Sequence, residues 1–186
     1  MHFLDEIDFK SIENIEFKYD FDFCVLLGDI PPRAIEIIAQ SITKPIFAVG
    51  GNHDTIDMFP FANITYLDGR MASVNGYTIA GISGSNRYKE DKTLFMLAQD
   101  ESKFVANKLP KADILISHDS AYHIFGKDDN KCGLKGISSY IKRKKPVLHL
   151  HGHYHRHQRY RLHKTNCICT YRVSLYKSDG TILTLF

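Results

Sequence analysis

The chain has 186 residues, of which 44% are hydrophobic and 24% charged, and its formal net charge is +3. This length suits one domain over residues 1–186, and the composition excludes a disordered protein. No apolar run approaches the roughly 20 residues that span a bilayer, and the first residues lack the basic-then-apolar pattern of a signal peptide. Because the four cysteines show no disulfide framework, we expect a cytoplasmic protein. The mild positive charge permits an anionic substrate without requiring nucleic acid.

The first predicted element is a short helix at 10–18, followed by an apolar strand at 21–27 of the kind that is covered on both faces. Pro31 and Pro32 open a helix that runs to about Ser41, because proline is tolerated in a first helical turn. The later elements, in chain order, are strands at 45–49, 64–67, 71–74 and 77–82, a helix at 91–108, a strand at 112–117, a helix at 134–143, and strands at 146–150, 158–163, 166–175 and 181–186. The helix at 91–108 is expected to bury Leu94, Leu97, Phe104 and Val105.

Residues of types that commonly bind metals follow four separate predicted strands. Asp29 comes after the first strand, residues 52–54 (Asn-His-Asp) after the second, His118 after a later one, and His153 and His155 after another. Alternation of strands with helices is typical of mostly parallel sheets, whose sites lie outside the carboxyl ends of the strands. The placement of these residues at one kind of strand end therefore predicts a metal site there.

Five of the ten histidines fall within residues 149–157. An apolar run leads into them, which predicts a buried strand that ends in a turn, and imidazole is a common ligand of transition metals. By strand alternation His149 and His151 point to the other face and have a structural role, whereas His157 lies on the surface. A solvated, weakly metal-binding histidine patch is the alternative interpretation of this stretch.

Four blocks of the sequence, Gly28-Asp29, Gly51-Asn52-His53-Asp54, His118 and Gly152-His153-Tyr154-His155, occur in this order. Together they resemble the signature of the calcineurin-like metallophosphoesterase family. The resemblance implies an α/β fold, a four-layer α/β/β/α sandwich of two mixed β-sheets flanked by helices.

The resemblance also implies a site for two divalent metal ions, of which manganese is favoured over iron, zinc or nickel. Asp29 would bridge both ions, Asn52, His118 and His153 would hold one, and His155 would bind the other. A metal-bound hydroxide would then attack phosphorus directly, without a phospho-enzyme. The implied activity is hydrolysis of a phosphodiester or phosphomonoester, with a small phosphate ester or a nucleotide as substrate.

His53 is not an implied ligand in this family. It would stabilise the transition state or protonate the leaving oxygen, with Asp54 orienting its ring. Arg156, next to His155, is the best candidate for contact with substrate, and Arg87 is a second candidate by its position only. Basic residues at 142–145 and after Arg156 can attract phosphate, although a solvated surface is the favoured interpretation and nucleic acid is not the favoured partner.

The sequence departs from the family pattern at its N-terminal end. The family begins with a strand that ends in D-x-H, and no D-x-H precedes Asp29. His2 lies at about the distance where that histidine would fall, so one hypothesis is that this reading begins at an internal methionine, with His2 as a metal ligand. If the shortening is real, one ion loses its acidic ligand. A weakly active enzyme with one metal, or an inactive metal- or nucleotide-binding domain, is then the alternative.

Overall fold

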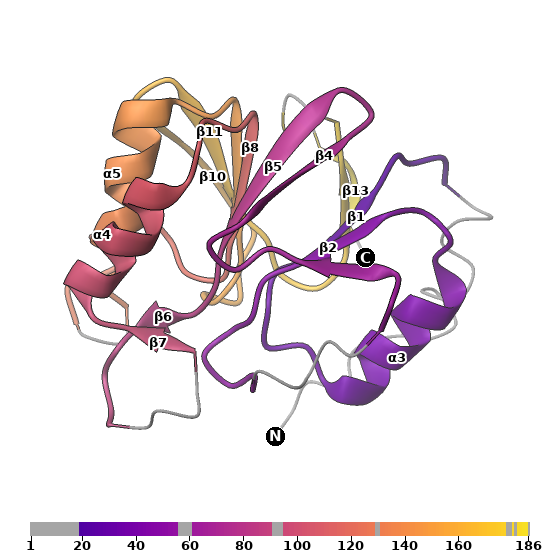
Figure 1. Ribbon diagram of the computed structural model, residues 1–186, viewed down its shortest axis with the longest axis horizontal. Helices are drawn as coiled ribbons and strands as arrows, with labels where there is room; N and C mark the ends of the chain where they lie inside the picture. Colours follow the sequence, from indigo (N-terminus) through magenta and orange to yellow (C-terminus); the bar gives the residue numbers. More distant parts are fainter. Residues whose placement is uncertain are drawn as a thin grey trace.

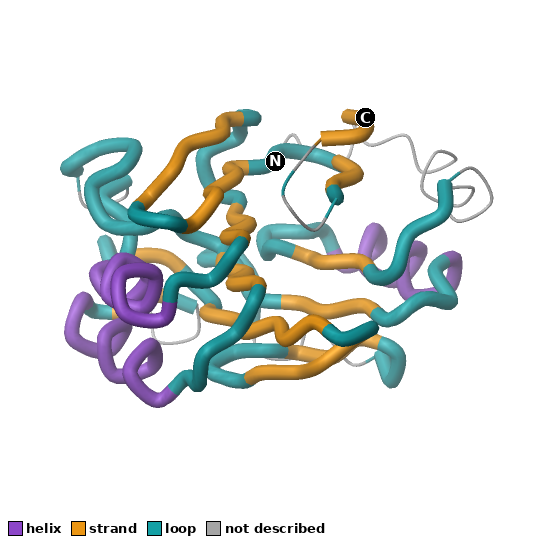
Figure 2. Tube along the Cα trace, turned by 90° about the horizontal axis from the view of Figure 1, so that it is seen from above, coloured by secondary structure: helices purple, strands orange, loops and turns teal. Residues whose placement is uncertain are grey.

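Two β-sheets lie face to face, and helices cover their outer sides, so the protein has four layers (Figure 1). The computed structural model describes residues 19–55, 61–90, 95–128, 131–177, 180 and 182–185. Seen from above, α4 and α5 lie on one outer side and α3 on the other, with the strands between them (Figure 2). The expected α/β/β/α sandwich is therefore confirmed.

The larger sheet has six strands in the order β10-β11-β9-β8-β5-β4. Its four inner strands, β11, β9, β8 and β5, are parallel, and the edge strands β10 and β4 are antiparallel to their neighbours. The bounds are β4 Met71–Val74, β5 Tyr77–Ile82, β8 Ile114–Ser117, β9 Leu148–His151, β10 Gln158–Leu162 and β11 Thr165–Cys169.

The smaller sheet has three parallel strands in the order β1-β2-β3, namely Cys24–Leu26, Ile46–Ala48 and Ile64–Tyr66. Two further strand pairs are short. These are β6 (Ser85–Asn86) with β7 (Met96–Leu97), and β12 (Ser174–Tyr176) with β13 (Ile182–Leu185). The helices are α3 Pro32–Ser41, α4 Gln99–Lys108 and α5 Lys135–Lys144. No described helix is long and apolar enough to cross a membrane.

Three apolar cores separate the four layers. Leu26 and Ile35 belong to the core between the smaller sheet and α3, whereas Leu27 turns to the core between the two sheets. This alternation follows from the twofold period of a strand. The third core, which includes Leu115 and Ile137, lies between the larger sheet and α4 and α5. Full burial of one such side chain contributes about 1.5–3 kcal/mol.

The prediction for 91–108 is wrong in two respects. The helix begins only at Gln99, because the preceding Met96–Leu97 segment pairs as β7 and the Glu101 carboxylate accepts the Ala98 amide at 2.8 Å. Phe104 is 60% exposed rather than inward, with the Lys108 ammonium over its ring. The face of α4 that meets α5 consists of small residues, Ser102 and Ala106, so the two helices pack too closely to admit a phenyl ring.

The other predicted helices and strands within the described residues have counterparts close to the expected bounds. One exception is the closing strand at 166–175, which splits into β11 and β12 because Arg172 has a left-handed backbone with φ of +60°. The predicted helix at 10–18, His2 and residues 91–94 lie outside the described residues.

Candidate functional site

Four loops that follow β1, β2, β8 and β9 bring Asp29, Asn52, His118 and His153 together. The Nε2 atom of His118 lies 3.2 Å from Asp29 Oδ2, 3.0 Å from Asn52 Oδ1 and 3.1 Å from His153 Nδ1. Asp29, His118 and His153 form the one group of at least three acidic, histidine or cysteine ligands found among the described residues that could hold a metal ion.

A hydrogen bond on the side of the ring away from the cluster fixes the orientation of His118. Its Nδ1 lies 2.7 Å from the carbonyl oxygen of Leu27, so Nδ1–H donates there and Nε2 faces the cluster. A proton on Nε2 cannot bridge the acceptors of Asp29, Asn52 and His153 at once, whereas a divalent cation can take them all as ligands. The donor set therefore fits a metal ion.

The ionisation of Asp29 suits a cation. Burial disfavours its charged form, but hydrogen bonds from His118 and from the His53 amide outweigh burial and lower the pKa of Asp29 to about 2. Burial likewise lowers the pKa of His118, but its contact with Asp29 outweighs burial and raises that pKa overall. A carboxylate is thus present at neutral pH for a metal to bind.

Two glycines allow the loops to meet. A Cβ on Gly28 would lie 2.2 Å from the Gly51 nitrogen, and a Cβ on Gly51 would lie 2.1 Å from the Asp29 carboxylate, so neither position tolerates a larger residue. The backbone of Asp29, His153 and His155 is left-handed, with φ of +54°, +68° and +48°. Such conformations are uncommon outside glycine and cluster at functional sites.

Asp54 binds backbone amides of two turns. One oxygen of its buried carboxylate accepts the amides of Asp29 and Gly51, both at 2.8 Å, and burial is the main reason that its pKa is raised. The Asp54 carboxylate thus joins the two turns, and its expected role in orienting the His53 ring stays a prediction. His53 itself is exposed, donates its amide to Asp29 at 2.8 Å and lines the cavity.

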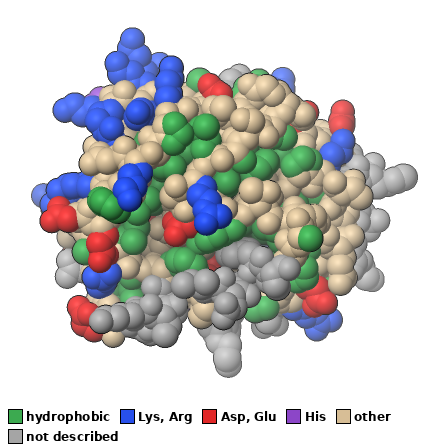
Figure 3. Space-filling view, in the orientation of Figure 1, with side chains coloured by type: hydrophobic (Ala, Val, Ile, Leu, Met, Phe, Trp, Pro, Cys, Tyr) green, Lys and Arg blue, Asp and Glu red, His purple; other side chains and the backbone are tan. Residues whose placement is uncertain are grey.

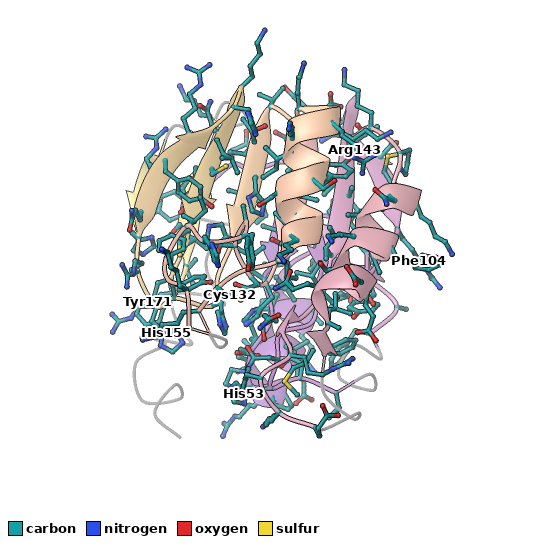
Figure 4. The ribbon with its side chains drawn as sticks, turned by 90° about the vertical axis from the view of Figure 1, so that its left-hand side faces the viewer. His53, Phe104, Cys132, Arg143, His155 and Tyr171 are labelled. Atoms are coloured by element: carbon teal, nitrogen blue, oxygen red, sulfur yellow. The ribbon has the colours of Figure 1, made fainter. Side chains whose placement is uncertain are left out.

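His155 lines the same cavity but lies outside the cluster of Asp29, His118 and His153. Its ring stacks on Tyr171, with ring centroids 5.3 Å apart, and Figure 4 shows it beside Tyr171, at the same end of the molecule as His53. His2 lies outside the described residues. The structure thus assembles the expected ligands of one ion more closely than those of the other.

The cavity over the cluster has a volume of about 760 Å³. Arg156 lines it, whereas Arg87 is not among its lining residues, because the Arg87 guanidinium donates to Glu101 at 2.7 Å and to the Met96 carbonyl. Its neighbour Tyr88 lines the cavity instead and accepts a hydrogen bond from the Asn52 amide at 3.1 Å. The loop selected by sequence reasoning thus reaches the cavity through Tyr88, and contact of Arg87 with substrate stays a prediction.

His149 and His151 are fully buried and are not among the residues that line the cavity. Their rings stack at 5.0 Å, and each has a hydroxyl partner, Ser117 at 2.7 Å for His149 and Tyr160 at 3.0 Å for His151. Burial lowers the pKa of His149 to about 3. His157 is exposed, as expected.

The basic run at 142–145 lies far from the cluster. Figure 4 shows Arg143 at one end of the molecule and His53 and His155 at the other. Lys and Arg side chains gather on the surface over α5 and the neighbouring β10 and β11 (Figure 3). These positions agree with a solvated surface rather than a wall of the cavity.

Sequence and structure comparisons agree with each other. The family model described as calcineurin-like phosphoesterase matches residues 3–157. A search of curated proteins finds no match. Among solved structures, TT1561 of Thermus thermophilus is 16% identical with a TM-score of 0.67, over 91% of this chain and 86% of that one.

Two further solved structures carry descriptions of activity. The phosphopantetheinyl hydrolase PptH of Mycobacterium tuberculosis is 11% identical with a TM-score of 0.58, over 79% of this chain and 77% of that one. A Staphylococcus aureus protein assigned as a 5′-nucleotidase, in complex with α-ketoglutarate, is 15% identical with a TM-score of 0.54, over 94% of this chain but only 46% of that one. At these identities the likeness shows a common fold.

Proposed function

Because the chain belongs to the calcineurin-like phosphoesterase family, we propose that it is a metal-dependent hydrolase of phosphodiesters or phosphomonoesters. The observation that carries the proposal is the convergence of Asp29, Asn52 and His153 on the Nε2 atom of His118. The natural substrate is a small phosphate ester or a nucleotide.

Asp29 is proposed to bridge two divalent ions, with Asn52, His118 and His153 on one ion and His155 on the other. Manganese is the favoured metal. Ions held there would supply Lewis acidity and would lower the pKa of bound water towards about 7, which would provide a nucleophile at neutral pH. The Leu27 carbonyl keeps His118 turned to the site, and the glycines at 28 and 51 keep the Asp29 carboxylate in place.

His53 is proposed to act on the leaving group. Its amide is bound to Asp29 and its side chain is exposed in the cavity, so the imidazole can reach a substrate held over the cluster. Water attacks phosphorus, the bond from phosphorus to the leaving oxygen breaks, and His53 donates a proton to that oxygen. Loss of this proton donor is expected to lower the rate by about 10²–10⁴-fold.

Hydrolysis of bis-p-nitrophenyl phosphate with added manganese tests the proposal. We expect activity in the full chain and its loss in Asp29→Ala and His53→Ala. His163→Ala, in the exposed turn between β10 and β11, is the matched control and is expected to keep the activity. A folded, manganese-bound chain without hydrolysis would overturn the proposal.

A metal- or nucleotide-binding protein of the same fold is the second candidate. It is favoured by the position of His155, which stacks on Tyr171 outside the cluster. Metal analysis of the purified protein separates the two functions when combined with the assay. One bound ion per chain without hydrolysis supports the binding protein, and two ions with hydrolysis support the enzyme.

A further inference from the structure

One wall of the cavity is a stack of side chains that ends in an arginine. The Phe125 ring stacks on Tyr154, with centroids 4.3 Å apart, and the Arg156 guanidinium lies 5.4 Å from the Phe125 centroid. All three line the cavity together with Asp29 and His153 of the cluster. The exposed Arg156 therefore has its guanidinium over an aromatic ring, which we call the platform.

Contacts with neighbouring residues hold Tyr154 and Phe125 in place. The Tyr154 hydroxyl donates to the Asp119 carboxylate at 2.7 Å and accepts from the Ser120 hydroxyl at 3.1 Å. The Phe125 ring also makes edge contacts with Tyr160, with centroids 5.8 Å apart, and with His151. A fixed ring limits the positions that Arg156 takes, which lowers the entropy lost when the guanidinium binds an anion.

The charges around this wall are unbalanced. Arg156 and Lys131 both line the cavity, and no carboxylate of the described residues lies within ion-pair distance of either. The acidic residues that line the cavity are Asp29 and Asp54, and both are already bound at its floor by His118 or by backbone amides. Arg156 and Lys131, which we call the rim cations, thus have no ion-pair partner among the described carboxylates.

Chain connectivity limits the distance between rim and floor. Arg156 follows His153 by three residues, and three residues of extended chain span at most about 11 Å. A molecule held at the cluster by one phosphate can therefore place a second anionic group at Arg156. A simple monoester that places its only phosphate at the cluster has no second anionic group for the rim cations.

We propose that Arg156 and Lys131 form a second phosphate subsite, so that the substrate is a small organic molecule with two phosphate groups, one reacting and one bound at the rim. The proposal rests on the proposed function, since it names the substrate class of that site. The Phe125 platform gives the subsite its position, and the guanidinium suits phosphate because it donates two parallel hydrogen bonds.

Calorimetric titration of the manganese-loaded full chain tests the subsite by binding, independently of hydrolysis. Adenosine 3′,5′-bisphosphate and adenosine 5′-monophosphate are compared under the same conditions, with adenosine as the uncharged reference. We expect the bisphosphate to bind at least tenfold more tightly than the monophosphate, because a hydrogen bond to a charged group typically contributes tenfold or more to affinity. Equal affinity for the two nucleotides would overturn the proposal, as would binding of neither.

Substitutions test which residues cause the preference for the bisphosphate. Arg156→Gln and Lys131→Gln are each expected to reduce the ratio of the two affinities by about tenfold or more. Arg161→Gln, an exposed arginine two residues beyond Arg159 on β10, keeps the same ratio as the unchanged chain. A ratio that falls equally in Arg161→Gln would assign the preference to general surface charge, and longer anions such as single-stranded DNA would then be the better ligands. A preserved ratio in a chain that does not hydrolyse bis-p-nitrophenyl phosphate overturns the enzyme but retains the subsite.

Discussion

The Tyr154 hydroxyl donates a hydrogen bond to the Asp119 carboxylate, and the two atoms lie 2.7 Å apart. Asp119 directly follows His118, and Tyr154 lies between His153 and His155, so this bond joins two loops that supply the cluster of candidate metal ligands. The same carboxylate accepts the Asn86 amide at 3.1 Å and the Ser120 amide at 2.7 Å. Asp119 is only 1% exposed, and it therefore holds three segments around the cavity from inside the protein.

Replacement of Asp119 by Asn is expected to destabilise the protein by about 1.5–3 kcal/mol, the range for hydrogen bonds to charged groups. The amide nitrogen cannot accept from a backbone amide, so at least one buried donor loses its partner. Urea unfolding measures the change. Asp113→Asn is the control, because that carboxylate also accepts bonds from Thr78 but at a less buried position. Equal stability of Asp119→Asn and the unchanged chain would contradict the assignment.

Substitution of Tyr88 by Phe is expected to lower hydrolysis about 2–10-fold, the effect of one neutral hydrogen bond. The phenol accepts the Asn52 amide at 3.1 Å and thereby keeps the Asn52 oxygen turned to the cluster. The assay is bis-p-nitrophenyl phosphate hydrolysis at several manganese concentrations, where the variant should need more metal for half-maximal rate. Tyr122→Phe, whose ring stacks on His123, is the control and is expected to show no such shift.

Acid is expected to destabilise the protein through His149. The pKa of this buried imidazole is lowered from 6.5 to about 3 by burial. Its stabilising contribution is therefore complete above pH 6.5 and is lost as the pH falls towards 3. Because one proton changes the free energy of unfolding by about 1.4 kcal/mol per pH unit, the loss between pH 6.5 and 5 is about 2 kcal/mol.

His149→Phe tests this titration, since the replacement ring fills the space without taking a proton. Urea unfolding at pH 8 and pH 5 should show a smaller difference in the variant than in the unchanged chain. His163→Phe, at an exposed position, should leave the difference as it is. The assignment is wrong if His149→Phe shows the full acid sensitivity.

A methyl group at Gly136 is expected to separate α4 from α5. A Cβ at this position would lie 2.1 Å from the Ser102 carbonyl oxygen, a contact that only a shift of the helix can relieve. Overpacking of this kind typically costs about 1–3 kcal/mol, although alanine has the higher intrinsic helix propensity. Thermal unfolding should therefore show a lower midpoint for Gly136→Ala, whereas Lys142→Ala, on the exposed face of α5, should differ little from the unchanged chain.

Most positions of the strands and helices along the chain follow from local pattern. The apolar segments and the prolines before α3 mark the elements correctly because strand burial and proline geometry act within a few residues. The α4 prediction failed at Phe104 because the inward face is decided by the close contact with α5 at Gly136, which is a tertiary relationship. Propensity and periodicity contain no information on that contact.

The ligand types of the site were predictable from residues that follow strands, since parallel strands present their carboxyl ends at one edge. The residues that hydrogen-bond to the ligands and hold their loops together were not predictable from the sequence. The hydrogen bonds made by Asp119, Tyr88 and Asp54 depend on which loops come into contact in the fold. In the sequence alone, each of these residues also suits an ordinary turn or surface position. No spacing in the sequence distinguishes those alternatives.

The left-handed backbone at Asp29, His153 and His155 has a consequence for any attempt to improve the protein. Uncommon backbone conformations of this kind cost of order 1–3 kcal/mol each, and glycine would relieve them. Variants selected for thermal tolerance alone should thus accumulate glycine at these three positions and lose the side chains that are proposed to bind metal. Selection that screens heat resistance and catalysis in the same round should instead leave them untouched and find its gains elsewhere in the chain.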